Sequence, residues 1–480
     1  MRKQYRLLPF AGWAISKICA FPRARIFLFT LGLFLFAMMA GFLLPAATTA
    51  QNFVDLEPTP QQLEWQDLEF GVIVHFGLNT FTDKEWGSGK VSPSVFNPTQ
   101  FNPDQWVEAA KAAGAKYLVF VAKHHDGFCL FPTSLTKYSV ASSPWENGHG
   151  DVVRAVEESC RRHGLKFGVY LSPWDRHEPS YSDNKAYDKF YEGLMEELLR
   201  RYGPIEEFWL DGAGSEGHVY DFEDYLHQLR VYQPNALVFA DVGFMKWGDI
   251  RWAGNEDGFA PEENWDVIDR AGYLRWRPAE CDTPLHKLHW FWHPNDAQTL
   301  KTLPELMKIY DNSVGHGCQL MLGIAPDEQG LLPALDAARL REFGQEIHRI
   351  YAHNLTPEGT ASSSVGGNVR GAFDNNPDTF WLAPSGAYQA SLEVKFSSPV
   401  TFDRTVTMEW LNRGQNVEGY EVQAWEGGQW KTLHRGTSIG HKVIDIFPST
   451  TSTRVRLNIV GASHAAAIRE FQIYNGQGAP

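Results

Sequence analysis

The segment EFWLDGAGSEG places an acid, Asp211, directly after a hydrophobic stretch and before a run of small residues. A carboxylate at such a strand end faces open space, where it can act as a base, a nucleophile or a hydrogen-bond acceptor. An aspartate that caps a following helix gives the same local pattern. The segment alone leaves both interpretations open.

A second acid, Glu256, lies in RWAGNEDGFAPEENW, a glycine-flanked loop among tryptophans. Desolvation by such neighbours raises the pKa of a carboxyl group toward the range that a general acid needs. Asp257, Glu262 and Glu263 share this loop, and spacing alone does not separate them from Glu256. Its place beyond a strand end makes Glu256 the preferred partner for Asp211.

Three histidines follow the first two hydrophobic strands: His75, and the pair His124–His125 in KHHDGF. A neutral imidazole offers one donor and one acceptor, which suits sugar hydroxyls. Adjacent strand residues point to opposite faces, so both members of the pair enter one pocket only if the strand ends before them. Zinc is the alternative, but no suitably spaced third ligand is present. Glu85 and Trp86, in DKEWGSG, add an acceptor beside a flat aromatic ring.

Predicted strands and helices alternate along the part of the chain that carries these residues. From about residue 70 to 326, short hydrophobic strands are separated by amphipathic helices, which predicts a parallel sheet covered on both faces. The predicted strands span 70–77, 117–125, 166–174, 206–213, 236–244, 288–293 and 319–326, with a weaker one near 251–255. No G-x-G-x-x-G follows the first strand, which disfavours an open dinucleotide-binding sheet.

The polar residues His75, His124, Trp174 and Asp211 each fall at the carboxyl end of a predicted strand. A closed barrel gathers all such ends around one pocket, whereas an open sheet spreads them along an edge. The sequence therefore predicts an α/β fold of the (β/α)8-like TIM barrel type. After a predicted helix at 334–351, short alternating strands rich in Ser, Thr, Gly and Asn predict an antiparallel β-sandwich.

The two ends of the chain suggest how it is organised. Residues 1–25 are basic, 26–44 carry no charge, and small residues end at Ala50, which predicts a signal peptide over 1–50 or a retained N-terminal membrane anchor. The barrel is then expected over 51–354 and the sandwich over 355–480, both outside the cytoplasm. The mature cysteines have no metal-ligand spacing and are predicted to be buried free thiols. They are Cys129, Cys160, Cys281 and Cys318.

Composition narrows the class of partner. The net charge of −14 argues against nucleic acid, which requires a basic surface. The 17 tryptophans fit either core packing or stacking on sugar rings.

Six segments, in order between about residues 65 and 333, together resemble glycoside hydrolase family 29, the retaining α-L-fucosidases. They are GVIVHFG, EWG, KYLVFVAKHHDGF, KFGVYLSPW, EEFWLDGA and SVGHGCQLMLGIAPDEQGLLP. The resemblance implies that Asp211 is the nucleophile and that no cofactor takes part in catalysis. It also implies a set of fucose-binding residues: His75, Glu85, Trp86, His124, His125 and Tyr170.

RWAGNE resembles the W-x-G-N-E segment of the family branch that favours α-1,3 and α-1,4 linkages, which implies Glu256 as the acid/base. SPWDR and WFW also resemble that branch, and imply four further substrate-binding residues: Trp174, Asp175, Trp290 and Trp292. CDTPLHKLHWFWH departs from the branch's Pro–Gly–Trp approach, so the linkage preference stays open. The alternatives are a broader fucosidase, an enzyme for another axial sugar such as galactose, and a non-catalytic carbohydrate-binding protein.

The C-terminal part, 355–475, resembles a discoidin-like (factor 5/8 type C) module through TASSS, AFDNNPDTFW and AIREFQIYN. The resemblance implies a structural calcium, with Asp374, Thr379 and Glu470 as oxygen ligands. The expected partners are fucosylated oligosaccharides or glycoconjugates, and a membrane only if the N-terminal segment is retained.

Overall fold

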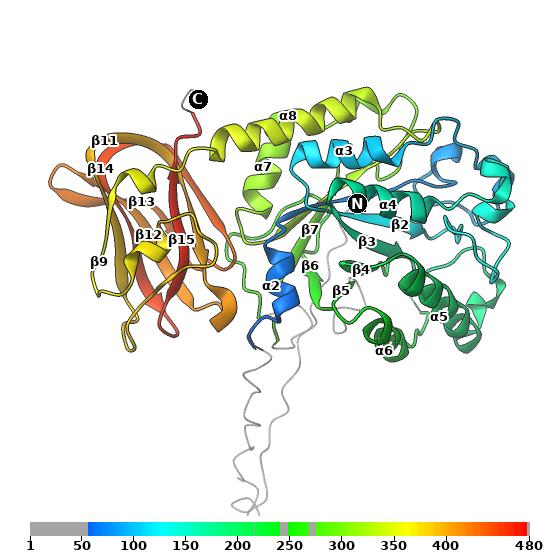
Figure 1. Cartoon of the computed structure of the whole chain (residues 1–480), viewed down its shortest axis with the longest axis horizontal. Coiled ribbons are helices and arrows are strands. Elements are labelled where there is room, and N and C mark those ends of the chain that lie inside the picture. Colours follow the sequence, from blue (N-terminus) through cyan, green and yellow to red (C-terminus); the bar gives the residue numbers. More distant parts are fainter. Residues whose placement is uncertain (1–55, 216, 241–247, 268–274, 478–480) are drawn as a thin grey trace, which may run out of the picture. The chain divides into compact units, whose positions relative to one another are not determined.

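The computed structural model describes residues 56–215, 217–240, 248–267 and 275–477. The predicted signal segment, 1–50, lies outside them. The N-terminal part of the described chain has eight parallel strands that close into a barrel, with β8 paired to β1, as predicted (Figure 1). They are β1 (Phe70–Val74), β2 (Tyr117–Lys123), β3 (Lys166–Leu171), β4 (Glu207–Leu210), β5 (Leu237–Ala240), β6 (Ile250–Trp252), β7 (Ala279–Pro284) and β8 (Gln319–Ile324).

Helices surround these strands (Figure 1). They are α2 (Pro60–Gln66), α3 (Pro103–Ala113), α4 (Val152–His163), α5 (Asn184–Arg201), α6 (Phe222–Tyr232), α7 (Leu303–Ser313) and α8 (Ala334–Tyr351). Local sequence sets their ends. The Asn102 and Asp151 side chains accept from the first-turn N–H groups of α3 and α4, and Gly114 and Gly164 end these helices with positive φ.

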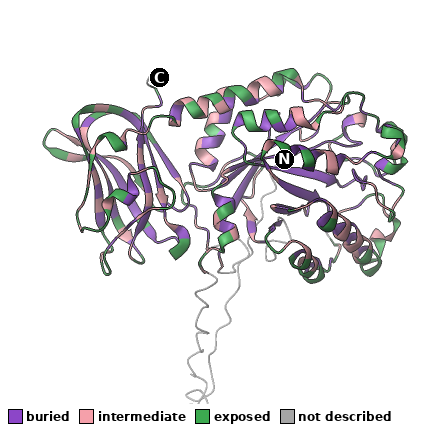
Figure 2. Ribbon diagram, viewed as in Figure 1, coloured by how far each residue is buried: buried purple, intermediate pink, exposed green. Residues whose placement is uncertain are grey.

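Strand periodicity sorts the side chains into two layers. Ile73, Tyr170 and Trp209 pack inside the barrel, while residues next to them in sequence pack against the helices. The strands are accordingly buried on both faces (Figure 2). His75 and Asp211 lie two residues beyond Ile73 and Trp209, so strand register carries them to the barrel's carboxyl-terminal rim.

The prediction for the seventh strand was wrong. The expected strand at 288–293 lies in the loop between β7 and α7, and β7 is the more polar AECDTP. Its Glu280 and Asp282 side chains are buried, and accept from the Tyr117 hydroxyl at 3.0 Å and from the Trp252 indole N–H at 2.6 Å. Because these acids have hydrogen-bond partners, a polar strand can form part of the barrel wall.

The C-terminal part is an antiparallel sheet in the order β10-β15-β11-β14-β12-β13, with β9 paired to β11. Its strands are β9 (Thr360–Ser363), β10 (Trp381–Leu382), β11 (Ala390–Glu409), β12 (Val417–Glu426), β13 (Gln429–Gly436), β14 (Val443–Ala462) and β15 (Ala467–Tyr474). Lys442 forms an ion pair with Glu69 of the barrel. Although burial opposes ionisation, Lys442 and His441 lower the pKa of Glu69 to about 2.

The prediction of free thiols holds for Cys129 and Cys160, which are buried and unpaired, and is wrong for the other two. Cys281 and Cys318 form a disulfide. Cys281 pairs with Leu320 in the β7–β8 register, and Cys318 precedes β8 directly, so the two Cα atoms are only 6.3 Å apart.

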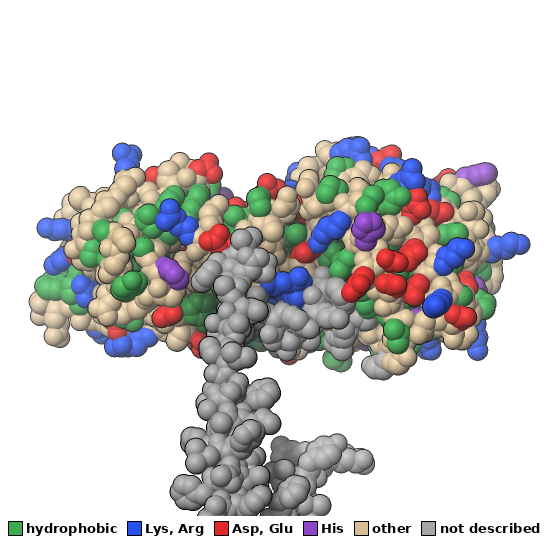
Figure 3. Space-filling view, turned by 90° about the horizontal axis from the view of Figure 1, so that it is seen from below, with side chains coloured by type: hydrophobic (Ala, Val, Ile, Leu, Met, Phe, Trp, Pro, Cys, Tyr) green, Lys and Arg blue, Asp and Glu red, His purple; other side chains and the backbone are tan. Residues whose placement is uncertain are grey.

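The surface carries both signs of charge. On the described part of the face in Figure 3, acidic and basic side chains are interspersed. Among the described residues, no helix has the length and apolar character needed to cross a bilayer.

Candidate active site

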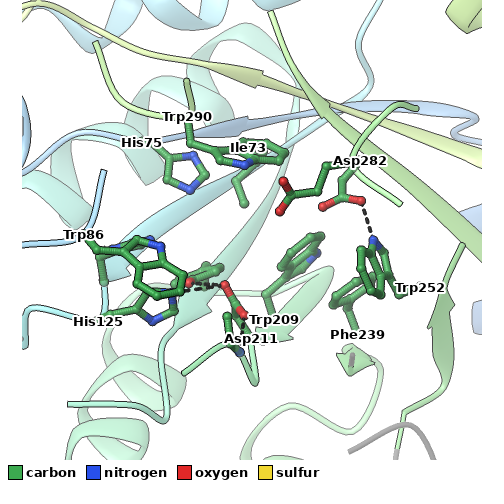
Figure 4. Close-up of a pocket in the computed structure, with 14 residues that line it drawn as sticks. Ile73, His75, Trp86, His125, Trp209, Asp211, Phe239, Trp252, Asp282 and Trp290 are labelled. Carbon is green, nitrogen blue, oxygen red and sulfur yellow. Dashed lines mark hydrogen bonds and ion pairs between the residues drawn. The ribbon is translucent and has the colours of Figure 1, made fainter. Parts of the chain in front are cut away.

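A cavity of about 690 Å³, open to solvent, lies at the carboxyl ends of the barrel strands. It is lined by Ile73, His75, Trp86, His124, His125, Tyr170, Trp209, Asp211, Ala213, Phe239, Trp252, Glu256, Asp282 and Trp290. Two walls face each other across it (Figure 4). His125 and Asp211 lie on one wall, and Asp282 and Trp252 lie on the other.

Asp211 follows β4 directly, and both of its carboxylate oxygens are held. The Tyr170 hydroxyl donates to Oδ2 at 2.7 Å, and the Ala213 backbone N–H donates to Oδ1 at 2.8 Å. His125 Nε2 lies 3.5 Å from Oδ2. Two hydrogen bonds from opposite ends fix the carboxylate's orientation while leaving lone pairs for a reacting atom. Trp209 and Phe239 form the pocket floor, where their rings stack with centroids 3.7 Å apart.

All three predicted histidines reach the pocket. Because β2 ends at Lys123, both His124 and His125 enter it. Burial lowers the pKa of His75 to about 3 and that of His125 to about 4, with Asp211 opposing both shifts, and it lowers the pKa of His124 as well. The rings are therefore neutral at neutral pH.

The tautomer of His124 follows from its neighbour. The Asn79 amide nitrogen donates to the Glu85 carbonyl at 2.9 Å, which fixes the orientation of the amide, and the same nitrogen lies 3.4 Å from His124 Nδ1. That ring nitrogen must accept, so Nε2 carries the proton. His124 therefore offers a donor to a ligand.

Of the acids in the RWAGNEDGFAPEENW loop, only Glu256 lines the pocket. It is exposed at the rim, but protein atoms desolvate its pocket side and raise its carboxyl pKa. A hydrogen bond from Trp290 opposes this shift, and the negative charge of Asp211 adds to it. Glu262 instead pairs with His434 at 3.3 Å, and Glu263 accepts from the Trp265 indole at 3.1 Å.

Asp282, in β7, is a third pocket carboxyl that the sequence did not reveal. Burial raises its pKa to about 8, and the charges of Glu256 and Asp211 reinforce the shift. Its Oδ1 accepts from the Trp252 indole N–H, which opposes the shift and fixes the tryptophan against the pocket (Figure 4). A neutral carboxylic acid at this position can donate a hydrogen bond at neutral pH.

The remaining predicted binding residues divide into two groups. Trp86 is 52% exposed, and its ring lies edge-on to that of His125, with ring centroids 5.6 Å apart. Trp290 forms part of the wall beside His75. Trp174 does not line the cavity, but packs behind Trp86 at 5.3 Å.

Three other predicted residues also lie outside the cavity lining. Asp175 forms a buried ion pair with Lys123 at 3.1 Å and accepts from the backbone N–H groups of His177 and Glu178, so it shapes the turn after β3. Glu85 accepts from backbone N–H groups in the β7–α7 loop. Trp292, half-buried in the same loop, is not part of the lining.

The predicted calcium ligands come together in the C-terminal sheet. The Thr379 hydroxyl donates to Asp374 Oδ1 at 2.8 Å. Both carboxylate oxygens of Glu470 are buried and have no hydrogen bond of ordinary length to any described residue. Burial, reinforced by the charge of Asp374, raises the pKa of Glu470 to about 7. In the described part of the chain, no three His, Cys, Asp or Glu side chains form a metal cluster, so Thr379 and loop oxygens would have to complete such a site.

Sequence reasoning missed several pocket residues that lie inside the strands. Ile73, Trp209 and Phe239 line the floor, and Asp282 forms part of a wall. The period-two pattern could have found the floor, because Trp209 and Ile73 each precede a predicted site residue by two positions. No comparable signal marks Asp282, since its strand is not hydrophobic.

Comparison with protein families gives two matches. A model described as alpha-L-fucosidase matches residues 46–349, and an F5/8 type C domain model matches residues 358–471. Alpha-L-fucosidase 1 of Arabidopsis thaliana is 36% identical over 426 residues, which is 83% of this chain and 83% of the plant protein.

Solved structures that resemble this chain are also described as fucosidases. A putative alpha-L-fucosidase from Bacteroides thetaiotaomicron has a TM-score of 0.83 and 32% identity, covering 88% of this chain and 98% of its own. A Ruminococcus gnavus family 29 fucosidase in complex with fucose has a TM-score of 0.81 and 28% identity, with coverages of 88% and 95%.

Proposed function

The chain belongs to glycoside hydrolase family 29, the α-L-fucosidases, and from this premise we propose that it releases terminal α-1,3- and α-1,4-linked fucose with retention of configuration. One observation carries the proposal: Asp211 and Glu256 reach the same pocket from different strand ends. Retaining glycosidases use one carboxylate as nucleophile and a second carboxyl group as acid and then base.

In the proposed first step, Asp211 attacks the anomeric carbon of fucose while Glu256 gives a proton to the leaving oxygen. Tyr170 and the Ala213 N–H hold Asp211 in line for attack. The negative charge of Asp211 contributes to the raised pKa of Glu256, which favours the protonated acid in the free enzyme.

In the second step, Glu256 removes a proton from water, which displaces the sugar from Asp211. Asp211 carries no charge while it is esterified. Its negative charge then no longer raises the pKa of Glu256, so this pKa falls and Glu256 loses its proton more readily. Its conjugate base is then available when a base is needed. The neutral histidines, with His124 Nε2–H as a donor, bind sugar hydroxyls throughout.

The linkage preference rests on the pocket rim. Trp252 and Trp290 line the same pocket as Glu256, and Trp290 donates to it, so a leaving sugar bound near Glu256 would find flat surfaces for stacking. We expect faster fucose release from α-1,3- and α-1,4-linked oligosaccharides than from α-1,2- or α-1,6-linked ones, by about tenfold or more. Measuring free fucose from the four defined substrates tests this.

Two results would change the proposal. Faster cleavage of the α-1,2 substrate would remove the linkage assignment and keep the fucosidase. Preference for an aryl α-galactoside over the matching fucoside would move the activity to another axial sugar, since galactose adds a C6 hydroxyl to the fucose pattern.

We also propose that Asp374, Thr379 and Glu470 hold a structural calcium. The buried Glu470 oxygens beside Asp374 form a donor set that suits a hard cation, because the nearby Gln472 side chain and Asn376 N–H compensate the carboxylate only in part. Chelation should lower the melting temperature of the whole protein by about 5 °C or more, the effect of losing a tightly bound ligand. The Glu470→Gln variant should not respond to the chelator.

The pH dependence of melting checks the same site. Without metal, the pKa of Glu470 is higher in the folded than in the unfolded chain. Glu470 then contributes stability that is present below its ordinary pKa of 4.5 and lost as the pH rises through about 7. Calcium should abolish this loss in the native protein. A melting temperature unchanged by chelation at every pH would contradict the proposal.

Finally, we propose that the protein is exported. The basic, apolar and small-residue order of 1–50 supports export, and so does the Cys281–Cys318 disulfide, because disulfides persist mainly in oxidising compartments.

A further inference from the structure

His293, in the loop between β7 and α7, lies between two carboxylates from the loop that follows β1. Its Nδ1 is 2.5 Å from Asp83 Oδ1, and its Nε2 is 2.6 Å from Glu85 Oε1. A neutral imidazole has one N–H, so one of these contacts would then set a lone pair against a carboxylate. Only an imidazolium donates to both.

The surroundings of His293 favour that charge. Its side chain is 14% exposed, whereas that of Asp83 is 61% exposed. Burial opposes the charge, but the hydrogen bonds and charges of Glu85 and Asp83 outweigh it and raise the pKa of His293. His289 also faces it, with ring centroids 4.2 Å apart, and directs its own Nδ1 toward Asp296 at 2.9 Å.

Glu85 links His293 to the pocket. Its Oε2 accepts from the Trp290 backbone N–H at 2.9 Å, and its Oε1 accepts from the Phe291 N–H at 3.2 Å. Trp290 lines the cavity and donates to Glu256. The centroids of the Phe291 and His75 rings are 5.2 Å apart. The carboxylate of Glu85 therefore holds the backbone of two residues that shape the sugar pocket (Figure 4 shows Trp290 beside His75).

This loop depends on such contacts for its shape. Leu288 and Asn295, on either side of Trp290, have positive φ values of 77° and 68°, and Asp83 has 54°. Non-glycine residues adopt this region at a cost, so the surrounding contacts must maintain it.

We propose that His293 is a positioning residue: its imidazolium, held between Asp83 and Glu85, fixes the loop that presents Trp290 to the bound sugar. The inference rests on the proposed function for its kinetic consequence. When His293 loses its proton, one carboxylate contact becomes repulsive and the loop loosens. Sugar binding then weakens, while the chemistry at Asp211 is largely retained.

The test uses an aryl fucoside with a strongly acidic phenol, whose departure needs little help from Glu256. His293→Gln should raise KM about tenfold with kcat changed less than about threefold, because misplaced pocket contacts weaken binding first. In the wild type, KM should rise at alkaline pH as His293 loses its proton. His293→Gln should abolish this rise. His353→Gln, which breaks the exposed His353–Glu358 pair, is the matched control and should leave both constants unchanged.

Asp83→Asn keeps the imidazole and removes one anion. It should move the alkaline rise of KM to lower pH, a change that a purely structural role would not produce. The NMR signal of labelled histidine that disappears in His293→Gln should titrate above the ordinary value in the wild type, and lower in Asp83→Asn. A wild-type signal titrating at or below the ordinary value, or a KM profile unmoved by Asp83→Asn, would overturn the proposal. Absence of fucoside hydrolysis by the wild type would instead contradict the proposed function. The NMR titration would still decide the role of His293.

Discussion

Asp211→Ala is expected to lower kcat for an aryl α-L-fucoside by about 10³-fold or more, a loss of at least about 4 kcal/mol of transition-state stabilisation. Tyr170 and the Ala213 N–H hold this carboxylate at the end of β4, and the proposed mechanism makes it the nucleophile. The fold should persist, because Asp211 is a partly exposed rim residue rather than part of the barrel core. Circular dichroism and melting temperature check this.

Azide distinguishes a nucleophile from other essential acids. In the alanine variant a small anion can occupy the space of the missing carboxylate and attack the anomeric carbon from the same face, giving the β-fucosyl azide. Partial rescue with that product supports Asp211 as nucleophile. The matched control is Asp175→Ala, whose carboxylate lies outside the cavity beside Lys123. Azide should not rescue any activity that this variant loses. Near-normal turnover by Asp211→Ala would remove Asp211 from the mechanism.

The strands with clear hydrophobic patterns could be placed from sequence because burial on both faces demands it. The residues that follow them, His75 and Asp211, then reach the rim by period-two alternation alone. β7 could not be found this way. Its Glu280 and Asp282 are buried only because Tyr117 and Trp252, far away in the sequence, donate to them.

The contacts of Asp175 and the Cys281–Cys318 disulfide could not be predicted from sequence, for related reasons. A carboxylate after a strand can face a ligand or complete a turn, and the choice at Asp175 depends on Lys123, 52 residues away. The Cys281–Cys318 disulfide depends on the register between β7 and β8, which no local pattern contains. In each case, long-range pairing decided what local residue types left open.

Glu256→Gln is expected to separate two classes of substrate. An oligosaccharide leaves as a poorly acidic alcohol and needs a proton, whereas an acidic phenol leaves with little help. Glutamine keeps the shape of Glu256 but cannot give up a proton, so kcat/KM for a natural α-1,3-fucoside should fall by about 10²- to 10⁴-fold. For the activated aryl fucoside, kcat/KM should fall less than about tenfold, since that constant reports formation of the intermediate.

The pH profile gives a second, independent check on Glu256. If Glu256 is the proposed general acid, its protonated form is present at low pH and is lost as the pH rises through its raised pKa. In the wild type, kcat/KM for the oligosaccharide should therefore decline on this alkaline side, and Glu256→Gln should show no such decline from this group. Glu263→Gln is the matched control, because its carboxylate lies in the same loop but accepts from Trp265 away from the cavity. Equal losses on both substrates, with the decline retained, would make Glu256 a positioning group and leave the proton donor to be sought at Asp282, the other pocket acid whose raised pKa keeps it protonated at neutral pH.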